Sequence, residues 1–138
     1  MNRSRAVRGF TLTELVVAVA ILAILAGIAI PSYQGYVLRS GRSEAMTLLS
    51  EAAARQERYF TQNNSYASTA AALNMTSYVA GLKNYSLAIS NVGAATYTLT
   101  ATAIGSQVRD KECQTLTLDQ AGARGYSGTA ASASTCWP

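Results

Sequence analysis

Glu14 is an acidic side chain placed about one helical turn inside a long apolar run. An ionised group within a membrane span costs roughly 2.5–3.5 kcal/mol on insertion scales, and less near the headgroups. Either the side chain reaches the headgroup region, or it meets a positive partner when subunits pack together. Cleavage between Gly9 and Phe10 would create such a partner, because a neighbouring subunit can present the new α-amino group of Phe10 to Glu14. We favour the second interpretation.

Two cysteines, Cys113 and Cys136, lie near the C-terminus. A disulfide is the expected state in an exported chain, and closing a loop of this size stabilises a fold by about 3 kcal/mol. A metal site is disfavoured because the sequence contains no histidine and no third thiol. We therefore expect a Cys113–Cys136 disulfide, no metal and no cofactor.

Side chains in settings suited to catalysis are scarce. The chain has no histidine for acid–base work, no carboxylate pair at helical spacing and no phosphate-binding glycine loop. No serine or cysteine stands in a recognisable nucleophile setting. Asp110 and Glu112 flank Lys111, an alternation that is more typical of a solvated edge than of a cation site. The sequence therefore predicts a protein that is not an enzyme.

Arg109, Lys111 and Arg124 are basic residues in the same part of the sequence as two aromatic residues, Tyr126 and Trp137. Basic groups beside aromatic rings can bind nucleic acid. The alternative, which we favour, is a solubilising edge with the aromatic rings in the core. Three of the 11 basic residues lie within the first eight positions, so the other basic side chains exceed the seven acidic ones by only one. This charge balance gives little support to a general affinity for polyanions.

A run with a single charged residue extends from Phe10 to Ile30, between the three N-terminal arginines and Pro31. At roughly 1.5 Å rise per residue its length matches a bilayer core of about 30 Å. The basic flank should remain in the cytoplasm, which sends the C-terminus outward. We expect one transmembrane helix over residues 10–31, with a bend or local melting between Gly27 and Pro31.

Residues 32–138 are long enough for one soluble domain. Apolar side chains recur at helical spacing to about residue 62, with Arg42 and Arg55 assigned mostly to other faces. Residues 63–84 are predicted to form a polar loop with a short helix. Period-two alternation over about residues 85–119 predicts three antiparallel strands.

The C-terminal tail is rich in Gly, Ala, Ser and Thr from residue 123 to 134 and would be loose by itself. The disulfide-bounded region 113–136 ties it back, and we expect Trp137 to cover the bridge. Because the apolar faces of the strands should turn toward the helix, the head is predicted to be an α+β domain.

The N-terminus resembles the signal of type IV prepilins and type II secretion pseudopilins. The resemblance lies in the short basic leader, the glycine before phenylalanine and the acid that follows, in Gly9-Phe10-Thr11-Leu12-Thr13-Glu14-Leu15. It implies a leader over residues 1–9, cleavage after Gly9 by a prepilin peptidase, N-methylation of Phe10 and assembly through Glu14. Many members have Leu in place of Thr13, and we expect processing to be unaffected by this difference.

A second resemblance covers most of the chain, which is similar to PilE-type minor pilins, a group related to the ComP DNA-uptake minor pilins. It is carried by Ile30-Pro31-Ser32-Tyr33, Arg39-Ser40, Glu44-Ala45, residues 52–59, residues 97–101 and Arg109-Asp110-Lys111-Glu112-Cys113. The resemblance implies the type IV pilin fold, in which a long N-terminal helix packs on a small antiparallel sheet with a C-terminal disulfide loop.

The function implied is that of a minor pilin. It would enter the bacterial inner membrane as a single-pass prepilin with a periplasmic C-terminus, and then be built into, or prime, a cell-surface pilus. Its partners would be other pilin subunits, the prepilin peptidase, the inner-membrane assembly machinery and the lipid bilayer before assembly. The alternatives are a major pilin, a type II secretion pseudopilin, and a DNA-uptake minor pilin with nucleic-acid contacts at Arg109, Lys111 and Arg124.

Overall fold

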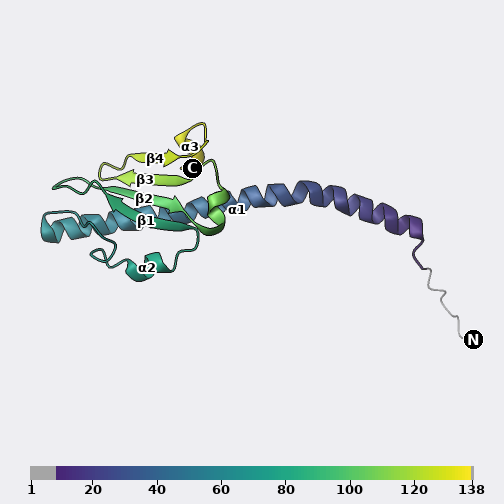
Figure 1. The fold of residues 1–138 in the computed structure, drawn as a ribbon, viewed down its shortest axis with the longest axis horizontal. Helices are drawn as coiled ribbons and strands as arrows, with labels where there is room; N and C mark the ends of the chain where they lie inside the picture. Colours follow the sequence, from purple (N-terminus) through teal and green to yellow (C-terminus); the bar gives the residue numbers. More distant parts are fainter. Residues whose placement is uncertain (1–8, 138) are drawn as a thin grey trace, which may run out of the picture. The chain divides into compact units, whose positions relative to one another are not determined.

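The computed structural model describes residues 9–137, so all of the predicted leader except Gly9 lies outside the described residues. The chain divides into two compact units, Met1–Tyr36 and Val37–Pro138. The first unit contains the N-terminal part of helix α1 (Leu12–Asn63), and the second contains the rest of this helix and all other elements (Figure 1).

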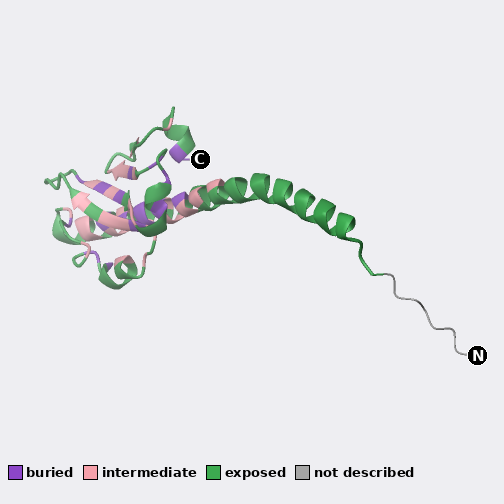
Figure 2. Ribbon diagram, turned by 45° about the vertical axis from the view of Figure 1, so that its right-hand side comes forward, coloured by how far each residue is buried: buried purple, intermediate pink, exposed green. Residues whose placement is uncertain are grey.

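In the first unit, α1 is an uninterrupted helix with an apolar and exposed surface. Leu22 and Ile28 are 64% and 66% exposed, and Figure 2 shows nearly all of this part of the helix as exposed. By length and composition, α1 is long and apolar enough to cross a membrane. Of the bend or local melting expected between Gly27 and Pro31, the melting is wrong, because every residue in this stretch is helical, and the bend stays a prediction. So much apolar surface needs lipid or other helices to cover it.

In the second unit, which we call the head, one face of α1 is buried turn after turn. Its buried residues follow the helical period and lie on one face: Arg42, Ala45, Leu48, Leu49, Ala52 and Gln56. The apolar members of this face share one core with buried residues of the sheet and of the disulfide. The predicted α+β arrangement is confirmed.

The sheet has four antiparallel strands in the order β1–β2–β3–β4. Their bounds are Tyr85–Ser90, Thr98–Ala103, Thr115–Asp119 and Arg124–Ser127. Three short helical elements complete the head: α2 (Thr76–Ala80), the 3-10 helix η1 (Gly105–Arg109) and α3 (Ala133–Cys136). The short helix expected within residues 63–84 is therefore α2.

The first three strands alternate as predicted. Leu99 and Ala101 of β2 are fully buried, as is Leu116 of β3, which lies opposite Ala101. Thr100 and Thr117 are also directly opposite each other, and the period of two places them on the other face. The apolar rows therefore face the core, and the threonine rows face away from it.

The prediction of three strands is wrong, because β4 adds a fourth. Asp119 organises the turn before it: its Oδ1 accepts hydrogen bonds from the amides of Ala121 and Ala123 at 2.9 and 2.8 Å. Gly122 adopts a φ of +78°, which favours glycine. Tyr126 then pairs with Leu116. Sheet pairing therefore orders part of the tail that was expected to be loose.

Polar side chains of α1 fasten the connection between α1 and β1. The side-chain amide of Gln56 donates to the carbonyl of Ala67 and accepts from its amide, both at 2.8 Å, and Gln56 is fully buried. Arg55 donates to the carbonyl of Leu73 at 3.0 Å. These bonds satisfy backbone groups that the loop cannot pair within itself. The helix therefore shapes the loop as well as the core.

Candidate assembly site

Glu14 lies in the first turn of α1 and forms a reciprocal cap with Thr11. Its Oε2 accepts hydrogen bonds from the Thr11 amide at 3.0 Å and from the Thr11 hydroxyl at 2.7 Å, while the Glu14 amide donates to the same hydroxyl at 3.3 Å. This pattern is a capping box, which satisfies amides that a helix start leaves unpaired. Among the described residues no hydrogen bond reaches Oε1, so the carboxylate keeps one oxygen for another partner.

Phe10 and Glu14 line the same shallow, open and mostly apolar depression on the helix surface. Its other lining residues are Thr13, Val17, Ala18 and Ile21. The Phe10 side chain is 85% exposed. The residue that would carry the new amine and the acid assigned to receive one therefore share a face of the helix. A second helix lying on this face would meet both groups.

Gly9 precedes the expected cleavage point and has open space around it. A Cβ atom at this position would meet no other atom within 4 Å. The fold of the chain itself therefore does not require a glycine at position 9. Any requirement for a small residue at this junction must come from a partner, and a peptidase is the partner that the motif indicates.

The predicted disulfide between Cys113 and Cys136 forms in the head. Its Cα–Cα distance is 5.6 Å, and both cysteines are fully buried. Trp137, which was expected to cover the bridge, packs in the same buried cluster as both cysteines. Its indole Nε1 donates to the carbonyl of Gly125 in β4 at 2.9 Å. The disulfide and the tryptophan together fasten the C-terminus to the sheet.

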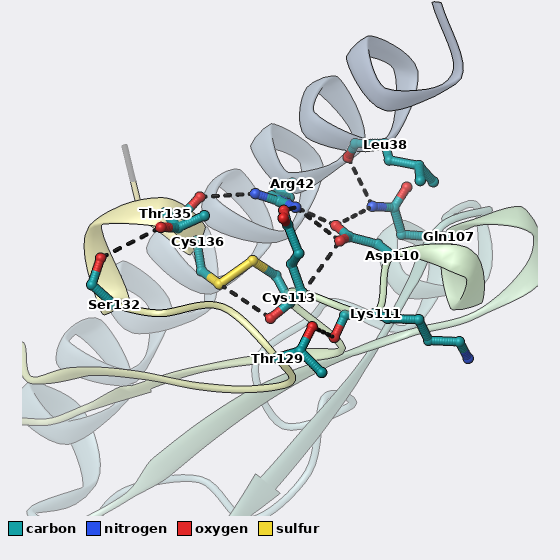
Figure 3. A network of polar contacts seen from close by, with 11 residues as sticks. Leu38, Arg42, Gln107, Asp110, Lys111, Cys113, Thr129, Ser132, Thr135 and Cys136 are labelled. Carbon is teal, nitrogen blue, oxygen red and sulfur yellow. Dashed lines mark hydrogen bonds and ion pairs between the residues drawn. A yellow bond between two sulfur atoms is a disulfide. The ribbon is translucent and has the colours of Figure 1, made fainter. Parts of the chain in front are cut away.

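Asp110 does not lie on a solvated edge as expected; it is 2% exposed and paired with Arg42 (Figure 3). The guanidinium donates to both Asp110 oxygens at 2.7 and 2.8 Å and to the Glu112 carboxylate at 2.7 Å. It also donates to the carbonyl of Thr135 at 2.8 Å. The Asp110 hydrogen bonds raise the pKa of Arg42 above its already high value. Both members of the buried Arg42–Asp110 pair thus have an opposite charge and several hydrogen bonds, which offset the cost of removing them from water.

Sequence reasoning missed Arg42 because it assigned charged residues of α1 to solvent. The available signal was its spacing: Arg42 stands three residues before Ala45 and seven before Leu49, on the face that carries the apolar stripe. A charge at such a position needs a buried partner of opposite sign. The cap between Thr11 and Glu14 was also missed, although its T-x-x-E spacing is visible in the sequence.

The candidate nucleic-acid contacts have different neighbours in the structure. Arg124, in β4, stacks over the Trp137 ring, with its Cζ 5.1 Å from the ring centre. Arg109 bonds the carbonyl of Ser106 at 3.3 Å. All three basic side chains, including Lys111, are exposed. The aromatic partner of Arg124 is thus packed in the head rather than offered to a ligand.

Removing the disulfide should loosen the C-terminus without affecting the leader. We expect Cys113→Ser to lower the free energy of unfolding by about 3 kcal/mol, the value for a loop of this length. Limited proteolysis of the full chain should then cut residues 128–135 more readily, while the size of the processed chain stays unchanged. Labelling of both cysteines by a thiol reagent in the native exported protein would contradict the premise.

Two protein-family models match successive parts of the chain. The prokaryotic N-terminal methylation motif matches residues 4–30. The family described as type IV minor pilin ComP, DNA uptake sequence receptor, matches residues 31–117. The first match contains the junction at Gly9 and Phe10, and the second contains most of the head.

Individual relatives agree with these matches. The fimbrial protein EcpC of Eikenella corrodens is 35% identical over 107 residues, which cover 75% of this chain and 70% of that protein. The type IV wide pilus major component PilA4 of Thermus thermophilus is 35% identical over 104 residues, which cover 75% of this chain and 79% of that protein.

A solved structure supports the fold. The non-core minor pilin PilV of Neisseria meningitidis aligns with a TM-score of 0.51 and 25% identity, over 71% of this chain and 94% of that one. PilV is named as a minor pilin, whereas PilA4 is named as a major component. The similar proteins therefore include both minor and major pilins. Because family models match both parts of the chain and relatives align with most of it, we conclude that the chain belongs to the type IV pilin family, whose members are structural subunits and not enzymes.

Proposed function

We propose that this chain is a minor pilin of a type IV pilus. It enters the inner membrane as a prepilin, is cleaved after Gly9 and methylated on Phe10, and then joins or primes the filament through residues 10–30. The observation that carries this proposal is the placement of Glu14, on the same helix face as Phe10 at the start of an exposed apolar helix. The match to a minor-pilin family supports the assignment as a minor rather than a major pilin.

The physics of helix association favours a polar contact as the decisive one. Lipid tails are as apolar as the side chains of α1, so burial of apolar surface gives helices little reason to leave lipid for one another. A carboxylate in that environment gains much more from a positive partner than it would in water. Glu14 and a neighbour's Phe10 amine would therefore hold helices together where apolar contact alone would not.

Stoichiometry distinguishes a minor from a major pilin. We expect quantitative mass spectrometry of sheared pili to find this chain in far smaller amounts than the principal subunit. Deleting its gene should then leave filaments made of that subunit, in reduced number if this chain primes assembly. Finding this chain as the most abundant pilin in the sheared fraction would assign it the major role and overturn the proposal.

DNA binding is a second candidate function, favoured by the family match and by how the charges of the head are used. Among the described residues of the head, each acidic side chain accepts an internal hydrogen bond, as Glu44 does from Asn84. Ion pairs in this part of the chain involve only two basic residues, Arg42 and Arg55. The basic residues outside these pairs are Arg39, Arg58, Lys83, Arg109, Lys111 and Arg124. Outside the ion pairs, these six basic residues stand against three acidic ones in the described head, Glu44, Glu57 and Asp119, which gives the unpaired surface an excess of positive charge.

A binding assay tests this second function directly. We expect the mature full-length chain in detergent to shift a labelled DNA duplex at low salt. Changing Arg109, Lys111 and Arg124 to Gln should weaken binding and reduce the slope of log affinity against log salt by about one for each phosphate that the variant no longer neutralises. Changing Arg39 and Lys83 to Gln is the control. Absence of binding at low salt, or equal weakening in the control, would contradict the assignment of these three residues to DNA.

A further inference from the structure

One guanidinium contacts both of the chain segments that carry the cysteines. On one side, Arg42 bonds Asp110 and Glu112, which precede Cys113. On the other side, its Nη1 donates to the carbonyl of Thr135, the residue before Cys136. Figure 3 shows Arg42 between these two segments, with the disulfide beside it. The disulfide and the Arg42 contacts therefore join the same pieces of chain.

Asp110 is itself held in place for this role. Its Oδ1 accepts the amide of Cys113 at 3.4 Å, so the carboxylate that binds Arg42 also orients the cysteine. The Gln107 side chain donates to Asp110 Oδ2 at 3.2 Å and to the carbonyl of Leu38 in α1 at 2.9 Å. Gln107 and Asp110 are each 2% exposed. The position of Cys113 relative to α1 is thus fixed by charged and amide groups.

None of these contacts involves a sulfur atom, so the network does not require the disulfide. Residues 128–134 are small and mostly exposed, so before oxidation the C-terminal segment is held mainly by Trp137, whose indole bonds the carbonyl of Gly125, and by its bonds to the other cysteine segment and to Arg42. The amide of Thr129 bonds the carbonyl of Lys111 at 2.9 Å, which brings this segment alongside the one that contains Cys113. The last anchor before Cys136 is the bond from Arg42 to Thr135.

We propose that Arg42 is a positioning residue for disulfide formation: it docks the two cysteine segments on α1 while both thiols are still reduced. A small disulfide oxidant such as oxidised glutathione supplies the chemistry. One cysteine thiolate attacks it, forming a mixed disulfide and releasing one glutathione. The second thiolate then displaces the other glutathione and forms the Cys113–Cys136 bond. The protein loses two electrons and two protons in total, and the oxidant becomes two glutathione thiols. Docking by Arg42 speeds the second, intramolecular displacement.

The test measures the effective molarity of the two thiols, which expresses how strongly the chain favours its intramolecular disulfide over mixed disulfides with glutathione. The full-length chain is held in detergent micelles. The reduced chain is equilibrated with defined ratios of oxidised and reduced glutathione, and its free, mixed and intramolecular forms are counted by mass spectrometry after alkylation. We expect Arg42→Lys, which keeps the charge but cannot span all three partners, to lower the effective molarity on the order of tenfold. The mixed disulfide should accumulate during oxidation.

Arg55→Lys is the matched control. It is the same substitution in the same helix, but Arg55 bonds Glu51 and the carbonyl of Leu73 rather than a cysteine segment. We expect its effective molarity to equal that of the unmodified chain. Similar falls in both variants would mean that general loss of stability is responsible, and would overturn the proposal.

Circular dichroism would reveal whether Arg42→Lys fails to fold. In that case a second variant, Glu112→Gln, tests the same proposal. The Glu112 side chain is 55% exposed and is the outermost partner of Arg42, so its loss should be tolerated. We expect a fall in effective molarity of roughly threefold, since one of the charged bonds is removed. An unchanged effective molarity in every folded variant of this network would overturn the proposal.

Discussion

Glu14→Ala should leave a chain that is inserted and cleaved normally but is missing from the filament. The substitution removes an acid that is costly within the bilayer, so insertion should be no worse than in the unmodified chain. Cleavage should persist because the peptidase acts at the Gly9–Phe10 junction. What is lost is the only described acid within the apolar span that can meet the Phe10 amine of a neighbour. Incorporation of a tagged chain into sheared pili, with processing scored on the same gel, measures both effects.

Further substitutions separate this role from helix capping. Glu14→Gln retains a side chain that can complete the cap with Thr11 but has no charge, and we expect it to fail in assembly. Thr11→Val removes the hydroxyl bonds of the cap and keeps the acid, and we expect it to be incorporated. Glu14→Asp should be incorporated partly because of its shorter reach, and Glu14→Lys should fail most completely. Incorporation of Glu14→Ala at the normal level would mean that the acid only reaches the headgroups.

Gly9→Val should leave the leader attached and the chain outside the filament. The larger side chain should obstruct the peptidase, whereas the chain itself has open space at this position, so folding of the head should be unaffected. The measured quantity is the mass of the membrane-inserted chain, which should retain all nine leader residues.

The matched control for this change is Gly27→Val. A Cβ at Gly27 also meets no atom within 4 Å, and the residue lies in the same apolar helix but far from the junction. We expect this variant to be cleaved fully. Normal removal of the leader from Gly9→Val would show that cleavage does not depend on a small residue at position 9.

The helix and the first three strands are predictable because their signals are local. Ala45, Leu49 and Ala52 recur at helical spacing, and Leu99 and Ala101 alternate with threonines. The fourth strand offers no such signal, since Tyr126 is the only large apolar residue within it. Its formation depends on the turn at Asp119 and on an edge that β3 presents only after the sheet has formed.

The charged network of the head is predictable only in part. The position of Arg42 on the buried face can be inferred from its spacing, but its partner cannot, because Asp110 lies 68 residues away. Asp110 stands among alternating charges, which usually indicates an exposed segment. The fold brings one of these acids inside and leaves Lys111 outside. The identity of such a pair is a property of the tertiary structure and not of any local pattern.

The N-terminus of the subunit in assembled pili is the most direct measurement of how this chain is processed and used. We predict that mass spectrometry of this chain from sheared pili will find an N-terminus at Phe10, with one methyl group on its α-nitrogen and the apolar helix retained. That result would show that the same molecule had been cleaved, methylated and incorporated into the filament. A filament-associated chain that begins at Met1, or one that begins after Ile30, would contradict the assembly role proposed for Phe10 and Glu14.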